Sequence, residues 1–403
     1  MSFIYNNKIQ YDDTQNLDAF GRLRVSQLTT VLEFKYMYDK LPLLVDELTN
    51  GVGATSNFVS SASSINMTVT SNGNYVIRQS KNRGVYQPGK SQLSEFTFSD
   101  FNIETNVIKI VGYYSTFTGS TFDSNYDGFF LESNGISNDI SFNIYQSGVL
   151  ILNSPVSAWT STHFNPATID WSKTQLMMVD FQWLGVGRVR FSMVFDGLPY
   201  TFVTNSGSNV LSEVYMKSPN QPIRYEIRSS GGTGTFNQIC SQSSIEGGVN
   251  QLFYAVGINT NISFGVASTG VRFPVIGWKL GDLFTGVESM ARGMAVLNET
   301  NDSYRVELIF NPVMSAPISY SALTNTPITY GVGNGTITTS GGTIMHTNFG
   351  IAGGTSVDNI PLTNNNIKPG VNINGSKDTV WLCITPLNNS SSYSAALNLE
   401  YFV

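Results

Sequence analysis

Residues 123–128, with the sequence DSNYDG, have the spacing at which carboxylate and amide oxygens bind calcium. They match the first half of the D-x-N-x-D-G calcium loop, which would make Asp123, Asn125 and Asp127 the metal ligands. The match then fails, because the twelfth position of the loop is Asn134 instead of a bidentate glutamate. An Asx-rich turn in a hairpin explains the same residues without a metal. We favour the turn and expect no cofactor.

Few residues elsewhere in the chain suggest a catalytic site. The two histidines, His163 and His346, have no companion at metal-ligand spacing. A Ser-His-Asp triad draws its members from distant positions, so spacing alone does not test it, but no Gly-x-Ser-x-Gly elbow accompanies the serines. A glycosidase needs two carboxylates across a sugar, and the 28 Asp and Glu residues are scattered without an evident pair. We therefore expect a protein that is not an enzyme.

The composition points to a folded protein with a weakly charged surface. Of the 403 residues, 41% are hydrophobic and only 12% are charged, against about 25% charged in ordinary globular chains. The surface must then consist mainly of Ser, Thr, Asn, Gln and Gly. The net charge is −6 and no dense basic run occurs, which argues against a nucleic-acid partner, because such proteins displace counterions with clustered Lys and Arg.

Cysteine usage and the N-terminal sequence suggest where the protein is made. Cys240 and Cys383 are too few for a disulfide framework, and we expect both to be reduced, buried and inert, as in a reducing cytoplasm. The first residues show no basic segment followed by an apolar one, so we expect no secretory signal. No stretch approaches the roughly 18 apolar residues that span a bilayer, so we expect no membrane insertion.

Alternation of apolar and polar residues predicts strands, and turn residues between them predict hairpins. Residues 65–70 and 75–78 flank the turn SNGN, residues 142–145 and 149–152 flank QSG, and residues 188–195 and 200–203 flank a turn with Asp-Gly. Helical periodicity is nearly absent, with one short helix conceivable at residues 42–49. Short strands at this spacing are typical of a β-sandwich or jelly roll. Five tryptophans lie in or beside apolar strands and are expected mostly in the core: Trp159, Trp171, Trp183, Trp278 and Trp381.

The chain divides into three parts by composition. Residues 1–29 are polar and have little core material, so we expect an arm. Residues 30–290 hold most of the tryptophans and the long aromatic strands, and they predict a jelly-roll-like β-sandwich. Residues 291–403 mix polar Gly, Ser, Thr and Asn tracts with strands, and they predict a second, smaller β-sandwich. No repeat of 20–50 residues occurs, which weakens a β-helix interpretation.

Five segments in order resemble a group of bacteriophage virion-associated proteins. Together they cover about residues 17 to 250, and the group's pattern opens with DAFGRLRVS. The matching segments are LDAFGRLRVS (17–26), YQPGKS (86–91), DFQWLGVGRVRF (180–191), PIRYEI (222–227) and QIC with EGG (238–248).

The resemblance implies a structural protein of a tailed phage, of the fibre, spike, collar or capsid-decoration type, located in the virion after assembly in the host cytoplasm. It brings no shared catalytic residues. Its partners would be other virion proteins and further copies of itself, with a trimer favoured. The alternative is a tail module for host attachment that binds a surface glycan or receptor, with residues 291–403 as the expected binding part.

The arm contains the segment that we expect to dock onto a neighbouring subunit. Phe20, Leu23 and Val25 are too few to build a core and would anchor the arm, while Arg22 and Arg24 would pair with carboxylates of the partner. The alternative is that the arm folds back onto its own sandwich.

Two strands in the matched segments carry alternating charges. Arg188 and Arg190 share one face of their strand. Arg224, Glu226 and Arg228 likewise share a face. A charge ladder between neighbouring strands and a solvated face both remain open. Trp183 lies between two strands and is expected to pack in the core.

Overall fold

The structure is a computed structural model that describes most of the chain. The described residues are 2–5, 8–11, 17–116, 125–161, 163–248, 253–266, 268–283, 286–300, 302–350, 357–361 and 368–402. Within them lie 30 strands and three single-turn 3-10 helices, η1 (Ser60–Ala62), η2 (Val156–Ala158) and η3 (Pro166–Thr168). All strand pairs are antiparallel across these residues, so the predicted all-β class is confirmed. In this part of the chain no helix is long and apolar enough to cross a membrane.

The chain forms two compact units whose division differs from the expected one. The first unit comprises residues 1–80 and 84–250, and the second comprises residues 81–83 and 251–403. The predicted boundary at 290 is therefore about 40 residues too late. The change of composition at 290 misled us because β18 (Phe253–Asn259) and β20 (Phe273–Leu280) are rich in apolar residues yet pair with strands from the C-terminal end of the chain.

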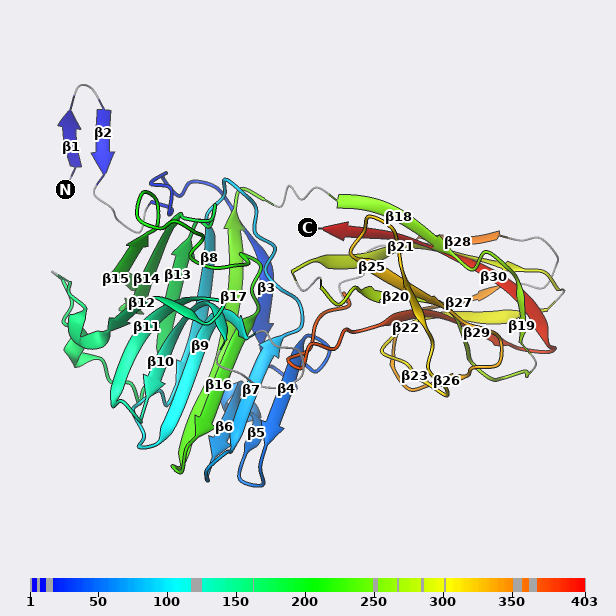
Figure 1. Cartoon of the computed structure of the whole chain (residues 1–403), viewed down its shortest axis with the longest axis horizontal. Helices are drawn as coiled ribbons and strands as arrows, with labels where there is room; N and C mark the ends of the chain where they lie inside the picture. The colour runs from blue at the N-terminus through cyan, green and yellow to red at the C-terminus, as the bar shows by residue number, and fades with distance from the viewer. Residues whose placement is uncertain are drawn as a thin grey trace. The chain divides into compact units, whose positions relative to one another are not determined.

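The first unit is a sandwich of two large antiparallel sheets (Figure 1). Sheet one has the order β12 (Val149–Pro155), β11 (Asp139–Gln146), β10 (Tyr126–Asn134), β9 (Val107–Thr116), β16 (Ile223–Ser229), β7 (Tyr75–Ser80) and β4 (Val45–Asn50). Sheet two has the order β15 (Leu198–Ser206), β14 (Arg188–Phe195), β13 (Gln175–Phe181), β8 (Gln92–Ser99), β17 (Gly234–Glu246), β6 (Ser64–Val69) and β5 (Thr55–Val59). Strand β3 (Leu28–Lys35) also pairs with β17, and β1 (Ser2–Tyr5) pairs with β2 (Lys8–Tyr11) in a separate two-stranded sheet.

The chain crosses repeatedly between the two sheets, as in a jelly roll. The hairpins β11–β12 and β14–β15 are confirmed. The predicted hairpin around residues 71–74 is wrong, because β6 pairs with β5 and β17 in sheet two whereas β7 pairs with β4 and β16 in sheet one. The turn residues change the direction of the chain as expected, but they carry it across the core and not to the neighbouring strand.

The helix conceivable at residues 42–49 does not form. Leu41 takes a positive φ of 59°, and a turn follows in which the N–H of Val45 donates to the Leu41 carbonyl at 2.8 Å. The chain then enters β4, where Glu47 and Leu48 extend alongside β7. Pairing with an existing strand outweighs the weak local preference for a helix.

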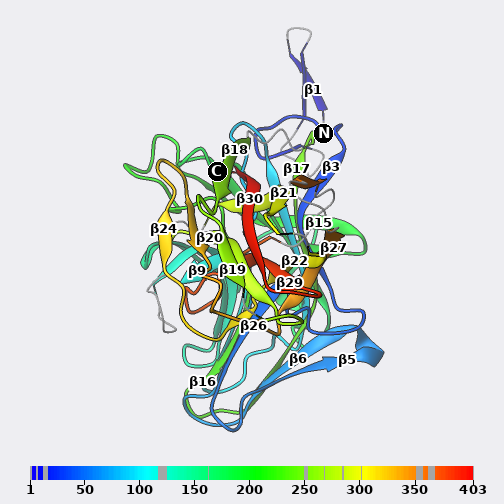
Figure 2. The same cartoon turned by 90° about the vertical axis from the view of Figure 1, so that its right-hand side faces the viewer.

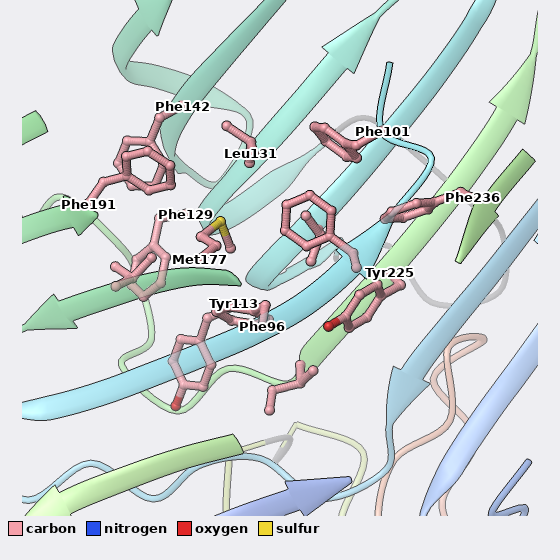
Figure 3. Packing of buried hydrophobic residues seen from close by; sticks show 14 of the residues in the cluster. Phe96, Phe101, Tyr113, Phe129, Leu131, Phe142, Met177, Phe191, Tyr225 and Phe236 are labelled. Atoms are coloured by element: carbon pink, nitrogen blue, oxygen red, sulfur yellow. The ribbon is translucent and has the colours of Figure 1, made fainter. Parts of the chain in front are cut away.

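The core between the two sheets is rich in aromatic side chains (Figure 3). Phe142 and Phe191 meet across the sandwich with ring centroids 4.6 Å apart. Trp159 is buried in this core, and Trp171 and Trp183 are half-buried against it. The other two tryptophans, Trp278 and Trp381, are buried in the second unit. Trp183 donates its Nε1–H to the Met216 carbonyl at 2.9 Å, so its polar atom is satisfied at the edge of the core.

The second unit is a smaller sandwich, as predicted (Figure 2). One sheet has the order β18, β30 (Ser391–Phe402), β21 (Glu288–Asn298) and β28 (Val357–Pro361), with β19 (Phe264–Val266) also on β30. The other has the order β24 (Tyr320–Ala322), β25 (Ile328–Val332), β20, β29 (Val380–Pro386), β22 (Tyr304–Phe310) and β27 (Thr343–Gly350). Strands β23 (Val313–Met314) and β26 (Thr339–Ser340) form a small separate pair. Tyr304 and Tyr393 meet between the two larger sheets, 5.2 Å apart.

The two cysteines differ in their surroundings. Cys383 is buried in β29, and burial raises the pKa of its thiol. Cys240 is exposed on β17, so the expectation that both are buried is wrong for Cys240. Strand β17 pairs with β6 up to Gln238 and with β3 from Cys240 onward. Its pairing with β8 is irregular at the same place, between Gln238 and Cys240.

Candidate functional site

Residues 17–24 form a tight turn that we call the latch. Leu17 and Leu23 pair as an isolated β-bridge, and Gly21 closes the turn with a φ of +77°. The carboxylate of Asp18 is fully buried and accepts the backbone N–H groups of Phe20 at 2.9 Å and Arg22 at 2.8 Å. The Arg22 guanidinium pairs with the other oxygen of Asp18 at 2.6 Å. An aspartate at this position thus shapes the turn and balances its charge.

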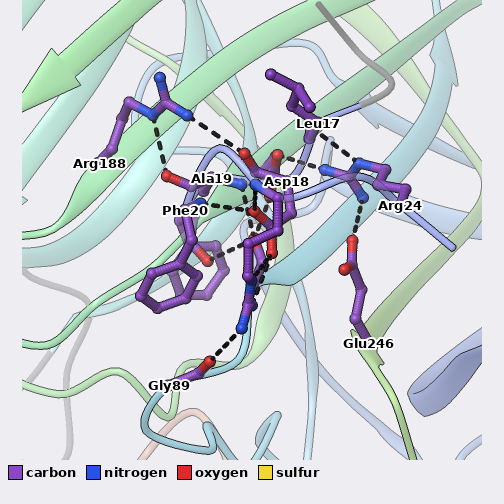
Figure 4. A network of polar contacts seen from close by, with 12 residues as sticks. Leu17, Asp18, Ala19, Phe20, Arg24, Gly89, Arg188 and Glu246 are labelled. Atoms are coloured by element: carbon purple, nitrogen blue, oxygen red, sulfur yellow. Dashed lines mark hydrogen bonds and ion pairs between the residues drawn. The ribbon is translucent and has the colours of Figure 1, made fainter. Parts of the chain in front are cut away.

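The backbone of the latch is held by side chains of the first sandwich (Figure 4). Arg188 on β14 donates from Nε to the Ala19 carbonyl at 3.1 Å and from Nη2 to the Asp18 carbonyl at 3.2 Å. The Ser91 hydroxyl accepts the N–H of Ala19 at 3.3 Å and donates to Asp180 Oδ1 at 2.6 Å. Buried backbone groups of the latch therefore have partners from strands that are far away in sequence.

A cluster of four charged side chains completes the latch. Arg24 donates to Asp180 and lies 3.0 Å from Glu246 between Nη1 and Oε1. Arg190, directly opposite Asp180 in the β13–β14 register, donates to the same carboxylate. Both arginines also donate to the carbonyl of Leu17. Burial raises the pKa of Glu246, the negative charges of Asp18 and Asp180 raise it further, and Arg24 opposes them.

The five residues predicted to dock onto a partner lie in different surroundings in the structure. Arg22 and Arg24 pair with carboxylates of their own chain, so the expectation that they pair with a partner's carboxylates is wrong. Phe20 is half-buried beneath the Arg22 guanidinium, which lies 4.5 Å from its ring centroid. Leu23 and Val25 remain 45% and 87% exposed. For residues 17–24 the arm folds back onto its own sandwich.

A hollow of about 300 Å³ opens beside the latch over the outer face of sheet two. Arg24, Asp180 and Glu246 form one wall, and strands β14 and β15 form the floor. The floor hydroxyls of Ser192 and Thr201 bond to each other at 2.9 Å. Within this wall, Arg24 pairs with both Asp180 and Glu246, so opposite charges face each other inside the latch.

A second charged cluster lies on the outer face of sheet one. Arg224 and Glu226 on β16 form an ion pair at 3.0 Å although their side chains are 1% and 0% exposed. Arg228 lies two residues further along the same strand, and its Nε is 3.8 Å from the other carboxylate oxygen of Glu226. Arg224, Glu226 and Arg228 share a face of β16 as expected, but this face is buried and not solvated. Their ion pairs join residues of one strand and do not connect neighbouring strands. The ladder between strands appears instead as the Asp180–Arg190 pair.

Aromatic side chains surround this second cluster. Tyr114 donates its hydroxyl to Glu226 at 3.4 Å, and its ring lies 5.3 Å from the Arg224 guanidinium carbon. Burial and the charge of Glu226 hold the pKa of both Tyr114 and Tyr126 well above its usual value. Burial also raises the pKa of Glu132, on the strand two places from β16. An arginine on each side of Glu226 makes it a structural counter-ion.

The calcium interpretation of residues 123–128 is not supported by the residues that the structure describes. Asp123 lies outside them, and Asn125 immediately precedes β10. Asp127 is buried and acts as a clamp for residues 217–221. Its Oδ1 accepts the N–H groups of Lys217 at 2.8 Å and Ser147 at 3.1 Å, and its Oδ2 accepts Ser218 N–H at 3.1 Å and Gln221 Nε2 at 2.7 Å. Four donors occupy the carboxylate that would have bound the metal.

The two histidines belong to different units. His163 is exposed in the loop before η3, and His346 is half-buried on β27 in the other unit. Across the described ranges, no three His, Cys, Asp or Glu side chains are grouped so that they could hold a metal ion. Exposed aromatic side chains are found instead, and in the second unit these include Phe253 at 56%, Tyr254 at 51% and Phe349 at 61%.

Comparisons with known proteins do not assign the chain to a family. No family model and no curated protein matches. Among solved structures, a Bacillus licheniformis β-glucanase aligns with a TM-score of 0.35 at 13% identity, over 55% of this chain and 100% of its own. The Emp47p carbohydrate recognition domain gives 0.36 at 12% over 55% and 98%, and a carbohydrate esterase from the Shiga toxin-encoding bacteriophage phi24B gives 0.33 at 12% over 55% and 100%. Likenesses this distant carry no argument about activity.

Sequence reasoning missed the partners that the latch uses. Ser91, Asp180 and Glu246 lie in segments 86–91, 180–191 and 238–248, and nothing in their local pattern marked them as neighbours of residues 17–24. The available signal was that polar and charged residues recur in segments that otherwise read as buried strands. Such residues are expected to be paired when the strand is buried.

Proposed function

We propose that this chain is a structural component of a tailed-bacteriophage virion and not an enzyme. The observation that supports the proposal is the latch. Four of the segments that resemble phage virion-associated proteins contribute Arg24, Ser91, Asp180 and Glu246 to it, and their polar groups bond to one another. That four of these segments supply side chains to one structural contact supports an architectural role for them.

The latch would also hold in place the base of a segment that docks onto a partner, residues 1–16. Residues 1–16 precede it, and the strands described there, β1 and β2, pair only with each other among the described strands. An isolated two-stranded hairpin is marginally stable in water. We propose that residues 1–16 gain their stability from a neighbouring virion protein, while residues 17–24 hold the sandwich to this anchor in a homo-oligomer.

The test is incorporation into particles. Phage that encode the intact chain are compared with phage that encode a chain lacking residues 1–16, and cryo-electron microscopy and quantitative mass spectrometry locate and count the protein. We expect one defined density, which disappears with the deletion while the truncated protein still folds in the infected cell. Absence of the intact protein from purified particles would refute the structural role. Normal incorporation of the truncated protein would refute the anchor alone.

A second candidate is a glycan-binding module for host attachment, favoured by the exposed aromatic residues of the second unit. Tyr254 and Phe349 are more than half exposed, and aromatic faces stack on sugars. Glycan-array binding that is lost in Tyr254→Ala or Phe349→Ala, and kept in the control Tyr38→Ala from the first unit, would support this function. Arrays without any bound glycan would count against it.

A further inference from the structure

Among the described residues, the free edges of the four larger sheets are protected in different ways, and β18 differs from the other edge strands. Unpaired edge strands invite pairing with another chain, and proteins prevent it with charges, prolines, bulges or short strands. Strands β3 and β4 carry charged residues, and β28 contains a charge and a proline. Strands β12 and β15 contain a proline and have an irregular register, and β27 also has an irregular register. Strands β5, β19 and β24 are only five, three and three residues long.

Strand β18 lacks all of these features. Its sequence, FYAVGIN, has no charge and no proline, and its seven residues pair with β30 in an unbroken register from Phe253 opposite Phe402 to Asn259 opposite Ala396. Figures 1 and 2 show β18 beside β30. In the strand order of the described residues no strand lies on its other side. Phe253, Ala255, Gly257 and Asn259 are all exposed.

The pairing with β30 determines which backbone groups of β18 remain free. Just beyond the strand, the N–H of Thr260 donates to the carbonyl of Ala395 at 3.0 Å, which continues the same register. Antiparallel strands alternate between residues that bond to one neighbour and residues that bond to the other. Tyr254, Val256 and Ile258 therefore bond to β30. The N–H and C=O groups of the four residues between and beside them point to the free edge.

The free N–H and C=O groups of β18 are complementary to the same groups of a second β18 strand that runs antiparallel to it. We propose that β18 pairs antiparallel with β18 of a second copy of this chain, about a two-fold axis at Val256. In this register Phe253 lies opposite Asn259 and Ala255 lies opposite Gly257, so all four edge residues of each copy find hydrogen-bond partners. Val256 then faces its own equivalent in the closer, non-hydrogen-bonded type of pair. The result is a continuous sheet across two second units.

The side chains of the strand suit this partner. No charge of β18 would meet a like charge of the second copy. Ala255 and Gly257 are small at the centre of the contact, and a Cβ on Gly257 would have only Asn398 within 4 Å, at 3.7 Å. Phe253 and Tyr254, which are 56% and 51% exposed in the single chain, flank the pairing. Isologous contact through one strand is a common way to build a two-fold dimer.

The first test measures the mass of the full chain in solution. Light scattering after size exclusion is expected to give twice 44.1 kDa. Ala255→Pro removes a free-edge N–H without removing a bond to β30 and is expected to weaken the dimer by about tenfold or more. The matched control Ala255→Thr keeps that N–H and the dimer. A monomer at all concentrations, or a trimer that Ala255→Pro does not affect, would overturn the proposal.

The second test does not depend on how well the proline variant folds. Val256→Cys is made together with Cys240→Ser, because Cys240 is exposed. Residues in a non-hydrogen-bonded pair are close enough for a disulfide, so mild oxidation is expected to give a covalent dimer linked at residue 256. Leu198→Cys, on the edge strand β15 and also exposed, serves as the control and should remain uncrosslinked. Equal crosslinking of both variants, or of neither, would contradict pairing at β18.

Discussion

Arg24 and Asp180 are 156 positions apart in the sequence and form a direct ion pair. The same oxygen of Asp180 also accepts from Arg190, whose side chain is only 5% exposed. One carboxylate thus compensates two guanidinium groups, one from the latch and one from β14. The attachment of residues 17–24 thus combines this carboxylate with the buried side chains of Leu17 and Ala19, whereas Leu23 is 45% exposed.

Asp180→Ala is therefore expected to destabilise the first sandwich by about 3–5 kcal/mol, because it leaves a buried arginine without its counter-ion. Urea unfolding followed by tryptophan fluorescence gives the change. Lys35→Ala is the control, since the side chains of its pair with Glu33 are 68% and 51% exposed and exposed ion pairs contribute little to stability. Equal unfolding midpoints for the Asp180 variant and the intact chain would show that the latch is not held by this cluster.

Asp127→Ala is expected to cost about 2–4 kcal/mol, because four donors lose a charged acceptor. Calcium at millimolar concentration should leave the melting temperature of both proteins unchanged. Differential scanning calorimetry with calcium and with chelator measures both effects. A melting temperature that calcium raises in the intact chain and not in the variant would restore the calcium interpretation.

Thiol labelling is expected to distinguish the two cysteines. Cys240 is exposed, whereas Cys383 is buried and burial raises its pKa, so little reactive thiolate forms there. One thiol should react with Ellman's reagent in the folded protein and two in urea. The variant Cys240→Ser should show no fast reaction when folded. Two fast thiols in the native protein would mean that β29 opens to solvent.

Lys377 predicts a change of stability at alkaline pH. Burial and the positive charges of Arg83 and Lys279 lower its pKa from 10.5 to about 8, with Asp282 opposing them. Between these two values the unfolded chain binds the proton and the folded chain does not, so the free energy of unfolding rises as the pH increases from about 8 to 10.5. The difference in stability between the intact chain and Lys377→Met should follow this rise. A difference that is constant or falls over that range would contradict the lowered pKa.

Much of the fold could be predicted from the sequence because it is encoded locally. Alternating residues and Asp-Gly or Ser-Gly turns predict the hairpins β14–β15 and β11–β12, and both form. The turn at residues 71–74 has the same local chemistry, yet the chain crosses there to the opposite sheet. Which strand a turn leads to depends on partners more than 100 positions away, such as β16 and β17, and a local pattern does not contain that information.

The candidate site could be predicted only in its residue types. The sequence indicated that Arg188 and Arg190 share a face and that residues 17–26 bind something. It did not indicate that the arginines bind residues 17–19 of the same chain, because an ion pair depends on spatial proximity and Asp180 and Glu246 are distant in sequence. The burial of Glu226 was also missed, since alternation identifies a face but not what covers it.

The latch joins the beginning of the first unit to its end, and this has a consequence for synthesis on the ribosome. Arg24 pairs with Glu246, so the N-terminal segment has no complete binding site until more than 220 further residues have been made. At roughly 5–20 residues per second this takes on the order of 10 to 40 seconds. During that interval Leu23 and Val25 emerge on a segment that is not yet attached. The first contacts that a nascent copy makes with chaperones or with other copies therefore precede the closure of its own sandwich.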